Sequence, residues 1–127
     1  MHVRDAMSES VLTIGPGHTI REASKAMATR KVGAAVVVDP DGEGAGIVTE
    51  RDILRAVADG VDPDVESVGS HVTTEIVYAA PTWTLTQAAE AMLRGGFRHL
   101  VVLDAGEVVG VLSVRDIVKH WHAELSG

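Results

Sequence analysis

The feature that most constrains the fold of this chain is an internal repeat. The stretch GIVTERDI at residues 46–53 returns as GVLSVRDI at residues 110–117, and the residues before each stretch also match at a shift of 65. A repeat of this length predicts a duplicated structural unit, and each copy alone is too small to bury a full core. We therefore expect one copy over residues 1–62, a second over residues 63–127, and packing of the two sheets against each other.

Each copy predicts the same order of elements, β-α-β-β-α. A short extended stretch and a proline precede an amphipathic helix, in which Ile20, Ala23 and Met27 share one face. A β-branched run then ends at the turn signal DPDG, residues 39–42, and a second strand leads into the second helix. The fold class is therefore α/β of the α+β type.

Composition narrows the range of functions. Hydrophobic residues make up 46% of the 127 positions, cysteine is absent, and the apolar runs are too short to cross a bilayer. The net charge of −7 is shared by both halves, which argues against a nucleic-acid partner because a duplex-binding surface is normally basic. We expect a cytoplasmic protein that binds neither nucleic acid nor membrane.

The repeated motif places a hydroxyl and a carboxylate where a strand becomes a helix. Thr49 is followed by Asp52, and Ser113 by Asp116, at the spacing of a helix-capping box. Capping alone is one interpretation of this motif. The other is a ligand site, because a helix N-terminus suits a phosphate and a nearby carboxylate suits a ribose diol.

The choice of acid favours the second interpretation. Capping boxes prefer the longer Glu or Gln, and the chain follows this preference at Thr19–Glu22 and at Thr84–Gln87. Both copies of the later motif instead have the shorter Asp. We therefore expect Asp52 and Asp116 to have a role beyond capping.

With these residues the chain resembles a tandem pair of cystathionine-β-synthase (CBS) domains, the Bateman module. The resemblance rests on the element order, on AAVVVDPDG and RHLVVLDAG, and on the motif G-h-h-[ST]-x-x-D, where h is apolar. It implies two units related by a pseudo-two-fold axis, with clefts for an adenosyl ligand: AMP or ATP above all, otherwise ADP, S-adenosylmethionine or NAD. The second copy departs from the family pattern at VGSHV, residues 68–72, where the first has VRDAM.

By the same resemblance, Asp52 and Thr49 serve one cleft, Asp116 and Ser113 serve the other, and each aspartate holds the ribose hydroxyls. Adenine is expected against the first strands, at Val11, Thr13, Ile76 and Tyr78.

The two copies differ before their central strands, where Arg98-His99 stands in place of Gly33-Ala34. The resemblance implies that these basic residues contact phosphate in the cleft built on Asp52; the alternative is a solvated strand edge. Arg51 and Arg115 are either further phosphate contacts or surface residues of the first helical turn.

No catalytic constellation is evident, and His120 and His122 have the wrong spacing for a helical metal pair, so we expect neither an enzyme nor a metal site. The predicted function is a stand-alone regulatory module that senses an adenosyl nucleotide and acts through a protein partner in trans or through a homodimer. The exposed helical faces and Trp121 favour a dimer interface. The alternative is a structural interaction module whose clefts are empty.

Overall fold

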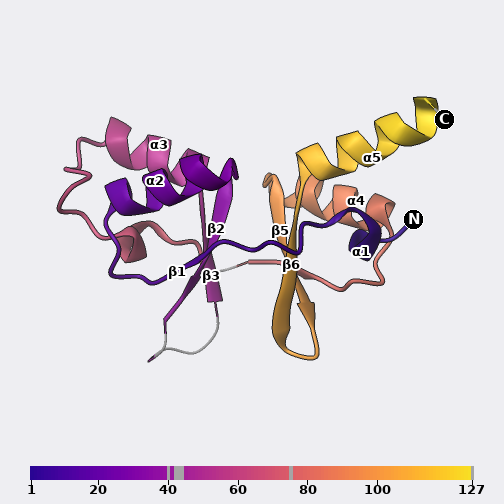
Figure 1. Ribbon diagram of the computed structural model, residues 1–127, viewed down its shortest axis with the longest axis horizontal. Helices are drawn as coiled ribbons and strands as arrows, with labels where there is room; N and C mark the ends of the chain where they lie inside the picture. The colour runs from indigo at the N-terminus through magenta and orange to yellow at the C-terminus, as the bar shows by residue number, and fades with distance from the viewer. Residues whose placement is uncertain (40, 42–44, 75, 127) are drawn as a thin grey trace. The chain divides into compact units, whose positions relative to one another are not determined.

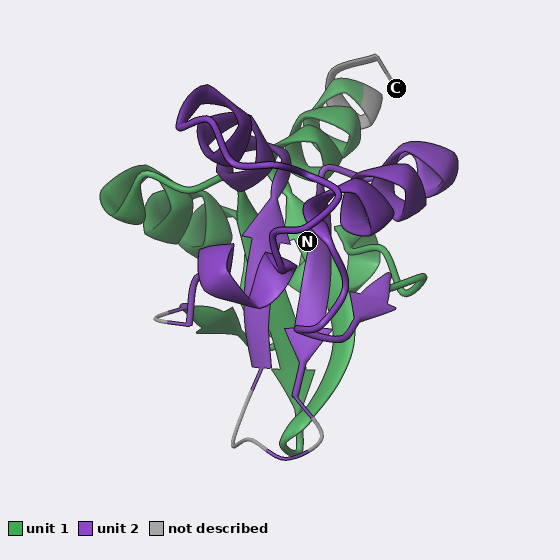
Figure 2. Ribbon diagram, turned by 90° about the vertical axis from the view of Figure 1, so that its left-hand side faces the viewer, with its two compact units in different colours: residues 1–11, 77–127 green, residues 12–76 purple. Residues whose placement is uncertain are grey.

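The chain forms two compact units, each with a three-stranded sheet. The computed structural model describes residues 1–39, 41, 45–74 and 76–126. Unit 1 comprises residues 1–11 and 77–127, and unit 2 comprises residues 12–76 (Figure 2). The mixed helix and strand content confirms the α+β class expected from the sequence.

Unit 2 has the strand order β1-β2-β3, with β1 parallel and β3 antiparallel to the central strand. Helices cover this sheet (Figure 1). Its elements are β1 (Thr13–Ile14), α2 (Ile20–Arg30), β2 (Ala34–Val38), β3 (Ala45–Thr49), α3 (Glu50–Ala58) and the 3-10 helix η1 (Val68–His71). The expected turn at residues 39–42 includes positions 40 and 42, which lie outside the described residues.

Unit 1 repeats this arrangement with the order β4-β5-β6. Its elements are α1 (Val3–Ala6), β4 (Tyr78–Ala79), α4 (Leu85–Gly95), β5 (His99–Asp104), β6 (Glu107–Ser113) and α5 (Val114–Ser126). The β-α-β-β-α order predicted for each copy is thereby confirmed.

The residues before β1 and before β4 join the unit of the opposite repeat. We call residues 1–8 and 66–73 the leading segments. The first lies in unit 1, where the Val3 amide donates to the Trp83 carbonyl at 2.8 Å. The second lies in unit 2, where the Val68 amide donates to the His18 carbonyl at 2.7 Å. The compact units therefore cut across the repeat boundaries read from the sequence.

Both leading segments end in the same pairing with the edge of a sheet. Ser8 exchanges two backbone hydrogen bonds with Val111 of β6, each 3.0 Å long, and Thr73 does the same with Ile47 of β3. Val3 and Val68 are both fully buried, each within the core of the unit it joins. Residues 68–72, which depart from the family pattern, thus occupy in unit 2 the place that α1 occupies in unit 1. They do so with the 3-10 helix η1 instead of an α-helix.

Candidate functional site

The glycine that opens each repeated motif leaves room for a leading segment. A Cβ on Gly46 would collide with Val72 Cγ1 and lie 3.1 Å from the Thr73 carbonyl oxygen. A Cβ on Gly110 would lie 2.6 Å from Met7 Sδ and 2.9 Å from the Ser8 carbonyl oxygen. Both glycines are thus needed for the close approach that seats the strand before its helix.

Thr49 ends β3 and caps α3. Its backbone amide donates to Asp52 Oδ2 at 2.8 Å, and the Asp52 amide donates back to Thr49 Oγ1 at 3.3 Å. The Thr49 hydroxyl also donates to Asp52 Oδ2, at 3.0 Å. These bonds satisfy donors that the first helical turn would otherwise leave unpaired.

Unit 1 repeats this cap at the start of α5. The Ser113 amide donates to Asp116 Oδ2 at 2.8 Å, and the Asp116 amide donates to Ser113 Oγ at 3.0 Å. The capping interpretation of the motif is therefore confirmed for both copies, and a role of the two aspartates beyond capping stays a prediction. An extended backbone at the cap residue brings the shorter carboxylate within reach of the amide, as Thr49 shows with φ −114° and ψ 164°.

Each cap uses only one oxygen of its aspartate. Within the described part of the chain, no group donates to Oδ1 of Asp52 or of Asp116, and both side chains are only half-buried. A half-buried carboxylate oxygen at a helix N-terminus is an acceptor fixed in position by its partner oxygen. It can accept hydrogen bonds from a pair of ligand hydroxyls without breaking the cap.

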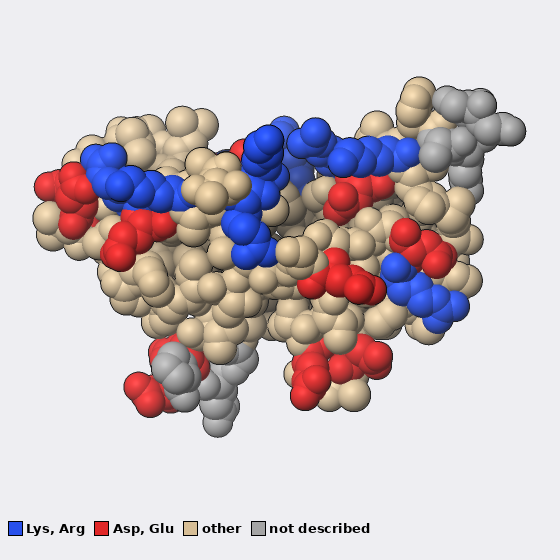
Figure 3. All heavy atoms as spheres, in the orientation of Figure 1, with Lys and Arg blue, Asp and Glu red and all other residues tan. Residues whose placement is uncertain are grey.

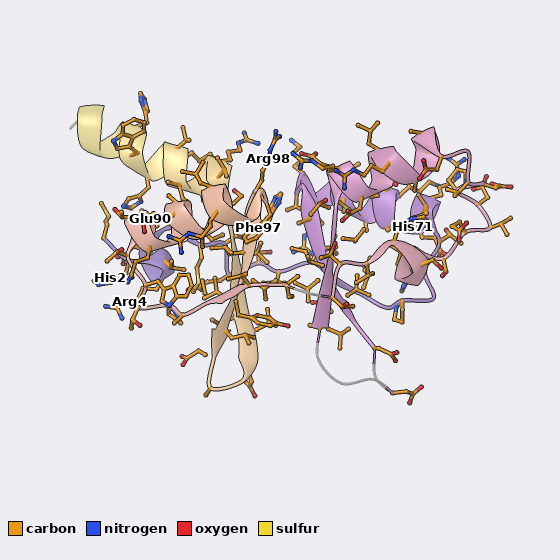
Figure 4. The ribbon with its side chains drawn as sticks, turned by 180° about the vertical axis from the view of Figure 1, so that it is seen from behind. His2, Arg4, His71, Glu90, Phe97 and Arg98 are labelled. Carbon is orange, nitrogen blue, oxygen red and sulfur yellow. The ribbon has the colours of Figure 1, made fainter. Side chains whose placement is uncertain are left out.

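The basic residues of the motif lie at the same end of their own unit. Arg51 and Arg115 are exposed in the first turns of α3 and α5. Arg98 is also exposed and immediately precedes β5, where its carbonyl accepts from the Val114 amide at 2.9 Å (Figure 4). His99 is the direct cross-strand partner of Ser113. Within unit 1, then, Arg98 and His99 lie beside the Ser113 motif.

The equivalent positions of unit 2 lack such side chains. Ala34 pairs with Thr49 across the strands, and the Gly33 carbonyl accepts from the Glu50 amide at 2.9 Å. The backbone is therefore the same in both units, while only unit 1 adds an arginine and a histidine. Whether Arg98 and His99 serve the cleft built on Asp52 stays a prediction.

The expected adenine contacts fall at the boundaries of the units. Thr13 and Tyr78 lie in the short strands β1 and β4, whereas Val11 and Ile76 precede the boundaries that separate the two units along the chain. Thr13 is exposed and the other three are half-buried. Their role toward a ligand stays a prediction.

Charge is unevenly distributed along each unit. The hairpin turns carry acidic side chains, including Asp39 and Asp41 in unit 2 and Asp104 and Glu107 in unit 1, whereas Lys and Arg lie mainly over the helices (Figure 3). The motifs end β3 and β6 at the end of each sheet away from its hairpin. This separation places the motif end of each unit in the less negative part of a negatively charged chain.

Sequence reasoning missed the residues that cover the motif glycines, namely Met7, Ser8, Val72 and Thr73. The signal in the sequence was the glycine of each motif. A glycine within a strand indicates that another backbone packs closely against it, but it does not identify the segment that does so. Among the described residues, no group of three or more His, Cys, Asp and Glu side chains could hold a metal ion. No helix within the described residues has the length and apolarity needed to span a membrane.

The chain belongs to the CBS-domain family, because the model of that family matches residues 3–59 and again residues 65–123. It is 34% identical over 117 residues to the uncharacterized protein MJ1225 of Methanocaldococcus jannaschii, covering 92% of this chain and 41% of that protein. The chain thus spans less than half the length of this relative.

Solved structures of CBS proteins share the fold. The CBS-domain containing protein ATU1752 of Agrobacterium tumefaciens is 37% identical with a TM-score of 0.85, covering 93% of this chain and 91% of that one. The CBS domain protein PAE2072 of Pyrobaculum aerophilum, solved in complex with AMP, is 32% identical with a TM-score of 0.83. That similarity covers 97% of this chain and 99% of PAE2072.

Proposed function

We propose that this CBS-domain pair is a regulatory module that binds an adenosine nucleotide, AMP or ATP above all, at the helix caps of Asp52 and Asp116. The observation that carries the proposal is the free Oδ1 of each capping aspartate, fixed beside a helix N-terminus in both units. The AMP complex of PAE2072, which this chain matches over 99% of the solved chain, supports the choice of ligand.

The chemistry of the site fits such a ligand. The free carboxylate oxygen accepts hydrogen bonds from the two ribose hydroxyls, and the helix N-terminus with Arg51 or Arg115 attracts phosphate. Arg98 supplies further positive charge, which we assign together with the His99 ring to the phosphate of the nucleotide. The module then acts by changing its contacts with a copy of itself or with a protein partner.

A ligand screen tests the proposal. Thermal melts are measured with AMP, ADP, ATP, S-adenosylmethionine and NAD, and a ligand at 100 times its dissociation constant should add about 2.7 kcal/mol to the free energy of unfolding. A rise with at least one of these ligands supports the proposal, and no rise with any of them contradicts it.

The second candidate function is a structural interaction module without a ligand. The complete capping boxes favour it, because capping alone gives Thr49, Asp52, Ser113 and Asp116 a structural purpose. The same screen separates the two candidates, since an interaction module without a ligand site would show unchanged melting with all five compounds.

A further inference from the structure

The first residues of the chain are held against the helices of unit 1. The carbonyl of Met1 accepts from the Leu85 amide at the start of α4 at 3.3 Å, and two residues later the Val3 amide donates to the Trp83 carbonyl. Helix α1, which these residues begin, also lies beside α5 within this unit. The backbone therefore fixes the Met1 side chain near the last helix instead of leaving it in solvent.

A thioether and an imidazole meet at this place. Met1 Sδ and His120 Nε2 of α5 are in direct contact. His120 is half-buried, whereas Met1 is 50% exposed, so a small ion reaches the two atoms from solvent. The partner of His120 is not His122, because residues two apart face different sides of a helix.

The two donor atoms select a class of metal ion. A thioether sulfur is a soft, uncharged donor that favours Cu(I), and an imidazole nitrogen also binds copper among several transition metals. Cu(I) is therefore the ion that suits both atoms. Zn²⁺ instead prefers a closed tetrahedral set of ligands, and no group of three or more His, Cys, Asp and Glu side chains provides one within the described part of the chain.

Trp121 adds an aromatic wall beside the two ligands. It lines the same hollow as Met1, and this hollow has a volume of about 420 Å³. The face of an indole ring attracts a nearby cation, and its bulk limits the access of water. Both effects favour a singly charged ion held at the edge of the hollow.

Unit 2 lacks this combination at its equivalent positions. Glu66 stands at the place of Met1 in the repeat, and Ala56 stands at the place of His120. Ala56 is also fully buried, so no ligand atom reaches the surface there. The pair of soft donors is therefore a property of unit 1 and not of the repeat.

We propose that Met1 Sδ and His120 Nε2 form a binding site for a soft, singly charged cation of the Cu(I) class, with Trp121 beside it. The ion replaces a weak contact between the two side chains by a bond to each of them. It thereby ties the first leading segment to α5. The inference does not depend on a nucleotide, so its failure would leave the proposed function untouched.

Titration of the whole chain with Ag⁺ tests the site, because Ag⁺ shares the soft character of Cu(I) and is not oxidised in air. Calorimetry should show that wild type binds a single Ag⁺ at this site. His120→Ala should lower the affinity by roughly a hundredfold, because loss of a ligand costs at least as much as loss of a group that orients one. The matched control is His122→Ala, which removes an exposed imidazole from the same helix and should keep wild-type affinity.

Nuclear magnetic resonance of isotope-labelled methionine methyl groups tests the sulfur ligand without a substitution. Ag⁺ should shift the Met1 resonance and leave those of Met7, Met27 and Met92 in place, whereas Zn²⁺ at the same concentration should shift none of them. An unmoved Met1 resonance with Ag⁺, or an equal shift with Zn²⁺, would overturn the soft-metal site. Wild-type Ag⁺ affinity in His120→Ala, or an equal loss in His122→Ala, would overturn the role of His120.

Discussion

The two units have the same backbone plan and different side chains at the places where a ligand or partner would be met. Both have a glycine under a leading segment, a hydroxyl cap and an aspartate that completes it. Only unit 1 adds Arg98 before its central strand, His99 as the first residue of that strand, and a long final helix with Trp121. The shared features build the same capped helix N-terminus in both units, and the differences change the charge and the apolar side chains around it.

The leading segments give the strongest test of this comparison. Val3→Ala and Val68→Ala each remove a fully buried side chain and should lower the free energy of unfolding by about 2–3 kcal/mol. In hydrogen exchange, Val3→Ala should lose protection first in residues 77–113, and Val68→Ala first in residues 12–62. If each variant instead loses protection first within its own sequence repeat, the leading segments do not pack on the unit of the opposite repeat.

The difference at the central strands predicts unequal phosphate recognition. Arg98→Ala should lower AMP affinity about tenfold and leave adenosine affinity unchanged, because a charged hydrogen bond to phosphate is lost. Gly33, at the equivalent position, offers a control, since Gly33→Ala changes no charge. Calorimetric titration gives both affinities, and an unchanged ratio of AMP to adenosine binding in Arg98→Ala would contradict the assignment.

Helices α2 and α4 are equivalent in the two units, and each is followed by a C-cap residue with a left-handed backbone. The residue at this position differs between the units. Lys31 ends α2 with φ 56°, whereas Gly96 ends α4 with φ 70° and has no atom near its missing Cβ. Lys31→Gly should therefore stabilise the chain by about 1 kcal/mol, and Gly96→Ala should destabilise it by about as much. Urea denaturation measures both, and shifts of the same sign would show that the backbone is not the cause.

The equivalent helices α2 and α4 also begin with different cap partners. The Thr19 amide donates to the Glu22 carboxylate and holds its pKa below the ordinary value, whereas Thr84 uses the uncharged Gln87. A lowered pKa in the folded state stabilises the fold above the unfolded pKa, and this stability is lost as the pH falls through the folded pKa.

Glu22→Gln should therefore make the melting temperature less sensitive to acid between pH of about 5 and 3. The effect is expected to be the smallest of the set because the Glu22 side chain is exposed. Melts of wild type and variant across this range measure it. Parallel curves would mean that the Glu22 cap contributes nothing to acid sensitivity.

The repeat in the sequence predicted the element order and the paired motifs because both follow from local patterns. Periodicity defined the face of Ile20, Ala23 and Met27, and all three are buried. The exchange of the leading segments escaped prediction because Ser8 pairs with Val111, a partner far along the chain that no local pattern specifies. The sequence left capping as one of two interpretations of the aspartates, because a statistical preference for Glu and Gln does not include the backbone geometry of a particular cap.

The measurement that most directly tests the central claim is calorimetric titration of AMP into wild type, Asp52→Ala, Asp116→Ala and Glu22→Ala. All three variants lose a capping partner, but only the first two lose a carboxylate of the proposed site. We predict that at least one aspartate variant loses tenfold or more in affinity, as expected for a charged hydrogen bond, while Glu22→Ala keeps wild-type affinity. Equal affinity in all four proteins, or no AMP binding by wild type, would contradict the account.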